Sequence, residues 1–311
     1  MILVTGGTGF IGRALVRQLV EAGHEVRTLI RPSPHSPRLP KGVPVEVAVV
    51  SLTDIRGLRA ALRGVDRIYH LAGGESKAEL FETDIEGTKT LVQVADEAGV
   101  QQIIFLSHLG ADKASAFPVL KAKGIAEEHI RRGKTPHTII RSSIVFGVED
   151  NFTTEILRLV RISPGFLFIP NKGQTRLQPL WVEDLVTSLL WSLDHPDLQD
   201  QSIEFGGSEY FTLRQVVEVI LLATGKKRLI FSASTPILRV LTVILAASIP
   251  NFPISGFFLD YLATDRTCEA DSLPRIFGLM PARFTYRLDY LRKKSWLEKL
   301  REKQANLKKA N

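Results

Sequence analysis

The stretch Thr5-Gly6-Gly7-Thr8-Gly9-Phe10-Ile11-Gly12 decides the fold, because it places glycines three residues apart between two segments of different periodicity. Before it, residues 2–4 form a short apolar run that is typical of a buried parallel strand. After it, residues 13–20 repeat apolar side chains with helical spacing. A strand, a glycine-rich turn and a helix in this order predict the phosphate-binding turn of a dinucleotide-binding unit.

Each glycine has a separate physical task in such a turn. Gly6 permits the tight change of direction, Gly9 lets the backbone approach a pyrophosphate, and Gly12 lets the helix pack closely on the strand. The free N–H groups and the positive dipole at the helix N-terminus favour the phosphates. We therefore expect NADP(H) or NAD(H) to contact Gly6, Thr8, Gly9, Phe10, Ile11 and Gly12.

The end of the second predicted strand, residues 25–30, bears on which of the two cofactors binds. An acidic residue there would bond the ribose 2′-hydroxyl of NAD(H), but the chain has Arg31-Pro32 and no carboxylate before Glu46. A guanidinium suits a 2′-phosphate. Arg31 therefore favours NADP(H), with NAD(H) as the alternative if this arginine is only an exposed loop residue.

Strand-like and helix-like segments continue to alternate along the first half of the chain. Further strands are predicted at residues 43–49, 67–73, 102–107 and 138–141, and further helices at residues 53–62, 86–98 and 121–131. This alternation predicts an α/β fold with a doubly wound parallel sheet and the ligand at the carboxyl ends of the strands. We expect a Rossmann domain at 1–150, a smaller substrate or partner lobe interleaved with it at 151–291, and a basic tail at 292–311.

Together these segments resemble the short-chain dehydrogenase/reductase superfamily in its extended or atypical, epimerase/dehydratase-like branch. The resemblance rests on the glycine turn and on His70-Leu71-Ala72-Gly73, Glu86-Gly87-Thr88, Phe105-Leu106-Ser107, Lys123, residues 141–147 and residues 178–185. Within the branch, the chain is most similar to the group of the nucleotide-binding accessory subunit of respiratory complex I. The resemblance implies catalytic or cofactor roles for Ser107 and Lys123, and cofactor contacts from Leu52, Leu71, Ala72, Gly73, Ser142 and Ile144.

The catalytic pattern of that superfamily is incomplete in this chain. An active member pairs a Tyr with a Lys four residues later, and the Lys lowers the pKa of the phenol that exchanges a proton with the substrate. Lys123 is present, but Val119 stands four residues before it, and no Tyr lies between Ser107 and Lys123. Asp84 also replaces an Asn that helps to shape the active site in relatives, and the third strand ends without the Asp that often meets the adenine.

Three interpretations of this departure remain open. In the first, Lys123 keeps only its contact with the nicotinamide ribose, and the protein supports an assembly or senses redox state without turning over a substrate. In the second, Lys123, His108 or Asp112 is the acid of an unusual reductase or epimerase of a hydrophobic small molecule. In the third, a Tyr from the C-terminal lobe reaches the site.

The net charge of +7 is concentrated at the end of the chain. Residues 292–311 contain eight Lys or Arg and two Glu, a net charge of +6, so the rest of the chain is nearly neutral. A nearly neutral body argues against a nucleic-acid-binding protein, which would carry a basic stripe on its folded surface. The tail is either a solvated terminal helix or a segment that an anionic membrane or an acidic partner attracts.

Residues 240–259 form an apolar segment with no charged residue between Arg239 and Asp260. Its length would suit a membrane span, but two prolines and an asparagine within 250–253 interrupt it. We expect a buried helix and a loop that close the C-terminal lobe. The alternative is an exposed apolar patch that seats on a membrane or on a subunit of a membrane complex.

The remaining composition narrows the class of protein. The single Cys268 cannot form an internal disulfide, and no charged segment followed by an apolar stretch opens the chain. We therefore expect a cytoplasmic protein, with peripheral membrane attachment as an addition. The histidines have no metal-ligand spacing and there is no Gly-x-Ser-x-Gly motif, so neither a metal site nor a serine hydrolase is expected.

Overall fold

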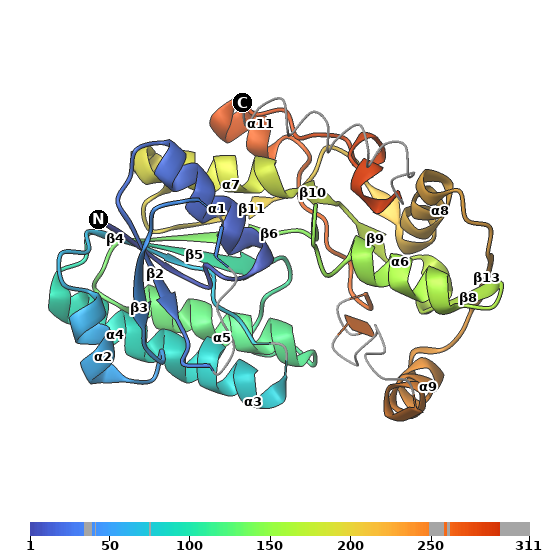
Figure 1. The fold of residues 1–311 in the computed structure, drawn as a ribbon, viewed down its shortest axis with the longest axis horizontal. Helices are drawn as coiled ribbons and strands as arrows, with labels where there is room; N and C mark the ends of the chain where they lie inside the picture. The colour runs from blue at the N-terminus through green and yellow to red at the C-terminus, as the bar shows by residue number, and fades with distance from the viewer. Residues whose placement is uncertain (34–38, 41, 75, 249–257, 260–261, 293–311) are drawn as a thin grey trace.

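The computed structural model describes residues 1–33, 39–40, 42–74, 76–248, 258–259 and 262–292. Figure 1 shows a layered α/β lobe beside a second, smaller lobe. The main sheet contains seven parallel strands in the order β11-β6-β5-β4-β1-β2-β3. Its strands are β1 (Ile2–Thr5), β2 (Val26–Ile30), β3 (Glu46–Val49), β4 (Arg67–His70), β5 (Gln102–His108), β6 (His137–Ser142) and β11 (Gln201–Phe205). The strand order reverses at β1 and β4, which confirms the predicted doubly wound sheet.

Helices cover both faces of this sheet (Figure 1). One face carries α1 (Phe10–Glu21) and α7 (Val182–Trp191), and the other carries α2 (Ile55–Ala61), α4 (Thr88–Ala98) and α5 (Pro118–Arg132). Leu15, Leu19 and Leu185 belong to the apolar core on the first face, whereas Leu58 and Leu91 belong to the core on the second. Inner strands such as β1 and β5 read as nearly continuous apolar runs because both of their faces are buried.

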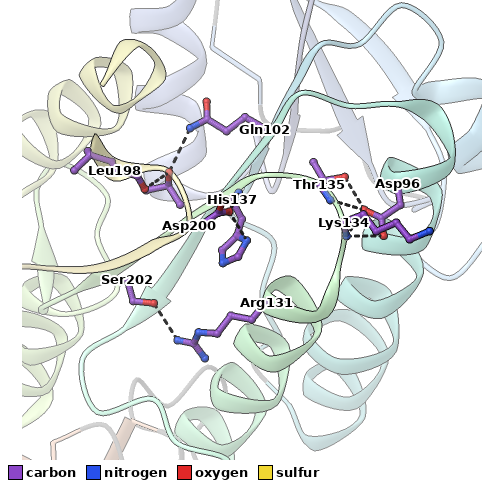
Figure 2. Close-up of polar contacts among 10 residues, drawn as sticks. Asp96, Gln102, Arg131, Lys134, Thr135, His137, Leu198, Asp200 and Ser202 are labelled. Carbon is purple, nitrogen blue, oxygen red and sulfur yellow. Dashed lines mark hydrogen bonds and ion pairs between the residues drawn. The ribbon is translucent and has the colours of Figure 1, made fainter. Parts of the chain in front are cut away.

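The sheet takes its last strand from beyond residue 150. Figure 2 shows how the chain before β11 is fastened to β6: the N–H of Asp200 donates to the carbonyl of His137 (2.6 Å), and the N–H of His137 donates to the Asp200 carboxylate (3.0 Å). The hydroxyl of Thr138 also donates to the carbonyl of Leu198 (2.9 Å). Since β11 and α7 belong to the layers of the first lobe, the segment after residue 150 is interleaved with it.

Among the described residues, the second lobe is built from short strands and three long α-helices. The helices are α6 (Thr153–Ile162), α8 (Leu213–Thr224) and α9 (Thr235–Ser248). The strands pair as β7 (Val145–Phe146) with β10 (Leu180–Trp181), β9 (Arg176–Leu177) with β12 (Phe211–Thr212), and β8 (Phe166–Ile169) with β13 (Leu229–Ser232). Leu157, Val160, Val216 and Phe284 pack in a core separate from those of the sheet. Thr212 begins α8 with a capping box, and Gly225 ends it in the left-handed conformation.

The helix predicted in the apolar segment lies on the surface and is not buried. Helix α9 covers residues 240–248 of that segment, and residues 249–257 lie outside the described residues. The side chains of Leu238 and Thr242 are buried, but those of Val240 and Val243 are 62% and 70% exposed. The expectation of a buried helix is therefore wrong for this part. In the portion of the chain that the structure describes, no helix combines the length and the apolar character needed to cross a membrane.

Candidate functional site

The glycine turn between β1 and α1 folds tightly, so that the backbone at Gly6, Gly9 and Gly12 lies close together. Gly6 has a φ of +72°, and the N–H of Gly9 donates to the carbonyl of Gly6 (3.0 Å). A Cβ atom on Gly12 would lie 2.1 Å from the same carbonyl oxygen, so no larger residue fits there. Arg13 fixes the turn from outside, because its guanidinium donates to the carbonyl of Thr8 (2.8 Å) and pairs with Glu149 (2.6 Å).

Two adjoining cavities open at the carboxyl ends of the strands, one on each side of this turn. Gly6, Gly9, Leu71 and Gly73 line both of them. The first has a volume of about 230 Å³ and the second about 560 Å³. Two cavities that meet at a glycine turn fit the elongated shape of a dinucleotide. Its pyrophosphate would lie at the helix N-terminus, with one half of the molecule in each cavity.

The first cavity lies against the ends of β2 and β3. The predicted contacts Thr8, Arg31, Leu52 and Ala72 line it. The Arg31 side chain is 61% exposed, and both of its terminal nitrogens lie 3.2 Å from one carboxylate oxygen of Glu79. Leu52 provides an apolar wall at the end of the third strand. The cavity therefore offers backbone, apolar surface, hydroxyl groups, the paired guanidinium of Arg31 and the carboxylate of Glu82.

The second cavity is bounded by α1, β5, α5 and the second lobe. The predicted contacts Phe10, Ile11, Gly12 and Lys123 line it. Val119 also lines it. The position four residues before Lys123 therefore faces the cavity, but its aliphatic side chain has no acidic proton to donate. Most of the remaining wall is apolar, and it includes Leu106, Val145, Phe152 and Phe258.

Lys123 forms a buried ion pair at the bottom of the second cavity. Its ammonium lies 2.9 Å from Oδ1 of Asp84, and the two side chains are 6% and 0% exposed. The other carboxylate oxygen of Asp84 accepts the N–H of Gly74 (2.7 Å), while Lys123 also donates to the carbonyl of Ala72 (3.4 Å). From the sequence, Asp84 was expected only to replace an Asn of the family pattern. The structure shows that it is the ion-pair partner of Lys123.

A π-helix places Asp84 in this position. It spans Leu80–Gly87 and continues directly into α4. Short π-helical segments of this kind are rare in proteins, and those that occur are often found at functional sites. The turn that follows β4 is pressed against its start, because a Cβ on Gly74 would lie 2.4 Å from the backbone of Glu79 and Leu80.

Ser107 does not face either cavity, which corrects the expectation of a catalytic role for it. Its hydroxyl donates to Glu127 on α5 (2.6 Å), and the same carboxylate accepts from Arg141 (2.7 Å) and Arg131 (2.7 Å). Because side chains alternate along a strand, the neighbours Leu106 and His108 line the cavity instead. Burial opposes ionisation of Glu127, but the bonds from Arg141 and Ser107 outweigh it and lower the pKa of this carboxyl.

Three further expectations do not match the observed positions. Ser142 is buried and its hydroxyl donates to the carbonyl of Ser107 (3.4 Å), and Ile144 lies within the core of the second lobe. Neither residue lines either of the two cavities, so their cofactor contacts stay predictions. Asp112 is exposed and its carboxylate accepts the N–H of Ala114 (2.8 Å), which turns it away from the proposed role of an acid.

Two histidines near the cleft are neutral at ordinary pH. His70 lies within hydrogen-bonding distance of Thr5 (2.7 Å) and Thr88 (2.8 Å), and burial and the Lys123 charge lower its pKa to about 3. Burial, with the charges of Arg266 and Lys123, also lowers the pKa of His108 well below its ordinary value. His108 thus presents an uncharged imidazole to the second cavity.

Comparison with known proteins agrees with this geometry. A family model described as NAD(P)H-binding matches residues 6–157. The chain belongs to the NAD(P)-binding short-chain dehydrogenase/reductase superfamily. Residues 6–157 are thus an NAD(P)H-binding domain by similarity.

Its relatives within the superfamily differ in what they do. Subunit 9 of the mitochondrial NADH dehydrogenase [ubiquinone] 1 alpha subcomplex from Arabidopsis thaliana is 30% identical over 226 residues, which are 70% of this chain and 56% of that protein. This chain thus spans little more than half of that relative. Ceramide reductase of Caulobacter vibrioides is 29% identical over 314 residues, covering 96% of both chains. The structure of a superfamily protein from Agrobacterium tumefaciens with bound NAD aligns over both full chains with a TM-score of 0.70 and 19% identity.

No described tyrosine takes the place of the superfamily's phenol. Tyr69, Tyr210, Tyr286 and Tyr290 line neither cavity, and Tyr261 lies outside the described residues. Tyr69 is buried and donates to the carbonyl of Leu189 (2.7 Å), and Tyr290 donates to Asp150 (2.9 Å). The described residues also contain no group of three or more His, Cys, Asp or Glu that could hold a metal ion.

Proposed function

We propose that this protein is an NADP(H)-binding member of the superfamily that lacks the usual proton transfer, and that it supports an assembly or senses redox state in the cytoplasm. The observation that carries the proposal is the floor of the second cavity, where Val119 replaces the phenol and Asp84 holds the Lys123 ammonium. A bound cofactor would supply hydride chemistry. Among the described residues, neither Val119 nor the paired Lys123 is poised to supply the matching proton.

The loss of the proton donor has a large expected effect. General acid catalysis contributes about 10²–10⁴ in rate, and a valine side chain cannot take part in it. An ammonium that already donates to Asp84 and to the carbonyl of Ala72 has little capacity left to assist. We therefore place turnover at a low level or at zero.

The preference for NADP(H) rests on Arg31. Its exposed guanidinium lines the first cavity, and a guanidinium suits a 2′-phosphate better than a 2′-hydroxyl. Glu79 holds this group in the structure, and a phosphate carrying two charges would compete for it.

Calorimetric titration of NADPH and NADH into the full chain tests the binding proposal. We expect NADPH to bind more tightly, and Gly9→Asp to abolish binding because it places a carboxylate beside the pyrophosphate. Ala60→Asp is the matched control: Ala60 is exposed on α2 of the same lobe and lines neither cavity. Equal affinity for both cofactors would contradict the role of Arg31, and unchanged binding by Gly9→Asp would contradict the site.

A gain-of-function series tests the proposed block to catalysis. We expect neither the natural chain nor Val119→Tyr to oxidise NADPH with a panel of ketones, because Asp84 still engages Lys123. The double variant Val119→Tyr/Asp84→Asn frees the ammonium to lower the pKa of the new phenol, and we expect about a 100-fold rise in rate. Rapid NADPH oxidation by the natural chain would overturn the proposal.

The shape of the second cavity favours one alternative, a reductase of an apolar small molecule. Its wall is formed largely by Phe10, Val145, Phe152 and Phe258, and the full-length relative from Caulobacter vibrioides is a ceramide reductase by name. In this alternative the neutral His108 would orient the substrate carbonyl. NADPH consumption with long-chain ketones that is lost in His108→Ala but retained in Ser107→Ala would favour it.

A further inference from the structure

The outer edge of the second lobe carries exposed apolar side chains on the paired strands β8 and β13 and on helix α9, which follows β13 in the chain. Phe166 and Phe168 on β8 and Phe231 on β13 are 42–47% exposed, and Ile237, Val240 and Val243 on α9 are 62–70% exposed. We call these six residues the apolar face. Figure 1 shows β8, β13 and α9 at the end of the second lobe that lies far from the main sheet.

Strand β8 and helix α9 carry apolar side chains on both their buried and their exposed sides. On β8 the alternate residues Leu167 and Ile169 are buried in the lobe, while the phenylalanine rings between them point outward and contact each other (5.5 Å between centroids). On α9 a stripe containing Leu238 is buried, and the opposite side is also apolar. A helix or strand that is apolar on every side needs a second apolar surface to cover it.

The charges around the apolar face are mostly positive. The carboxylate near it is that of Glu218, which pairs with Arg214 (3.5 Å), and Arg214 also donates to the carbonyl of Ile230 on β13 (3.2 Å). The sequence contains no Asp or Glu from residue 219 to residue 259, but it contains Lys226, Lys227, Arg228 and Arg239. Lys226 and Lys227 are exposed at the turn before β13, where Arg228 anchors the chain by donating to the carbonyl of Val160 (3.1 Å). The surrounding charge is therefore complementary to an anionic surface.

We propose that the apolar face lies on an anionic lipid bilayer, with its phenylalanine and aliphatic side chains in the interfacial layer and the flanking Lys and Arg residues at the level of the lipid phosphates. Apolar side chains bordered by an excess of cations are the pattern of interfacial attachment. A predominantly acidic rim would have argued against an anionic bilayer. This attachment goes beyond the cofactor-binding function and does not depend on it.

The position of the apolar face relates it to the cleft. Phe258 follows α9 by ten residues and lines the second cavity, and Leu259 next to it is buried. The segment that carries the apolar face is therefore followed in the chain by a residue that lines the larger cavity.

Flotation of the full chain with vesicles tests the proposal. We expect the protein to float with vesicles of phosphatidylcholine containing phosphatidylglycerol, and to bind about tenfold less to phosphatidylcholine alone. Val240→Glu/Val243→Glu places two carboxylates on the exposed side of α9, and we expect it to reduce binding to the anionic vesicles by about tenfold or more. Met280→Glu is the matched control, because Met280 is 76% exposed and lies outside the apolar face.

The same samples keep the result interpretable. NADPH binding and the melting temperature show whether each variant is folded, since α9 does not line the cavities. Failure of the natural chain to float, or equal flotation of Val240→Glu/Val243→Glu, would overturn the proposal. A dimer in light scattering that the double variant dissolves, without any vesicle binding, would assign the face to a second copy of the chain and would also overturn it.

Discussion

The two cavities on either side of the glycine turn differ in what encodes them. The first depends on backbone shape, because it opens beside the glycine turn and a Cβ on Gly6 would lie 2.7 Å from the backbone of Leu71 and Ala72. The second would depend in an active enzyme on a few side chains, and here those are Val119 and the Lys123–Asp84 pair. The comparison shows how cofactor binding and catalysis can separate within one cleft: the backbone site is complete, while the proton-transfer site has been replaced by an ion pair.

The largest effect is expected from the backbone half. Gly12→Ala would place a Cβ 2.1 Å from the carbonyl oxygen of Gly6, so the turn must open to accommodate it. We expect NADPH affinity to fall by at least about 100-fold, or about 3 kcal/mol. The NADPH-induced rise in melting temperature measures this, with the melting temperature of the free variant as the control for folding. A variant that binds within a few-fold of the natural chain would show that the turn tolerates the shift.

For the second cavity, the substitution with the largest expected effect is Asp84→Asn. The substitution leaves the buried Lys123 ammonium without its carboxylate, and breaking a buried pair costs about 3–5 kcal/mol. We expect the free energy of unfolding, measured with urea, to fall by about 2–4 kcal/mol because the cavity admits water. Glu86→Gln, which removes an exposed pair with Lys89, should cost less than about 1 kcal/mol. Equal losses would mean that the pair in the cavity is no stronger than a surface pair.

His70 is buried between Thr5 and Thr88 at the base of the cleft, and it makes the stability of the protein depend on pH. The folded protein holds its pKa at about 3, so an unfolded chain with an ordinary pKa of 6.5 binds a proton that the native state does not. This contribution to stability is complete above pH 6.5 and is lost as the pH falls towards 3. Between pH 6.5 and 5 the loss is about 2 kcal/mol. Urea midpoints at pH 7 and pH 5 should differ less in His70→Gln, and an unchanged difference would assign the pH dependence to other groups.

The smallest expected effect concerns cofactor choice in the first cavity. Glu79→Gln releases the Arg31 guanidinium from an exposed pair, which is worth about 0.2–1 kcal/mol. We expect NADPH to bind about threefold more tightly and NADH to be unaffected. Arg31→Gln is the complementary variant and should weaken NADPH alone. A change shared equally by both cofactors would separate Arg31 from the 2′-phosphate.

The sequence predicted the features that depend on local order along the chain. The glycine turn, the alternation of strands and helices and the valine at position 119 all follow from spacing within short segments. The expectation for Ser107 failed because its side-chain direction depends on how β5 packs against α5, and Glu127 lies twenty residues away. The Lys123–Asp84 contact joins residues 39 positions apart through a π-helix, for which the sequence carries no recognised signal.

Two further features were hidden by ordinary composition. Strand β11 was not predicted because an edge strand needs only one covered side, and Gln201, Ser202 and Glu204 give it a polar, exposed pattern. The apolar segment from residue 240 was predicted correctly as apolar, but composition does not say which side of a helix is covered. The direction of α9 was fixed only by the packing of Leu238 and Thr242.

Strand β11 also sets the order in which the molecule can form. The outer edge of β6 has no neighbour until residue 205 is available, so a ribosome must complete about two-thirds of the chain before the main sheet can close. Until then β6 presents unpaired N–H and C=O groups together with the apolar residues Ile139 and Ile140. Pairing across so many residues makes folding slow and ties both lobes into one cooperative unit. A fragment that ends near residue 150 would therefore associate through this edge and would not survive as a small cofactor-binding domain.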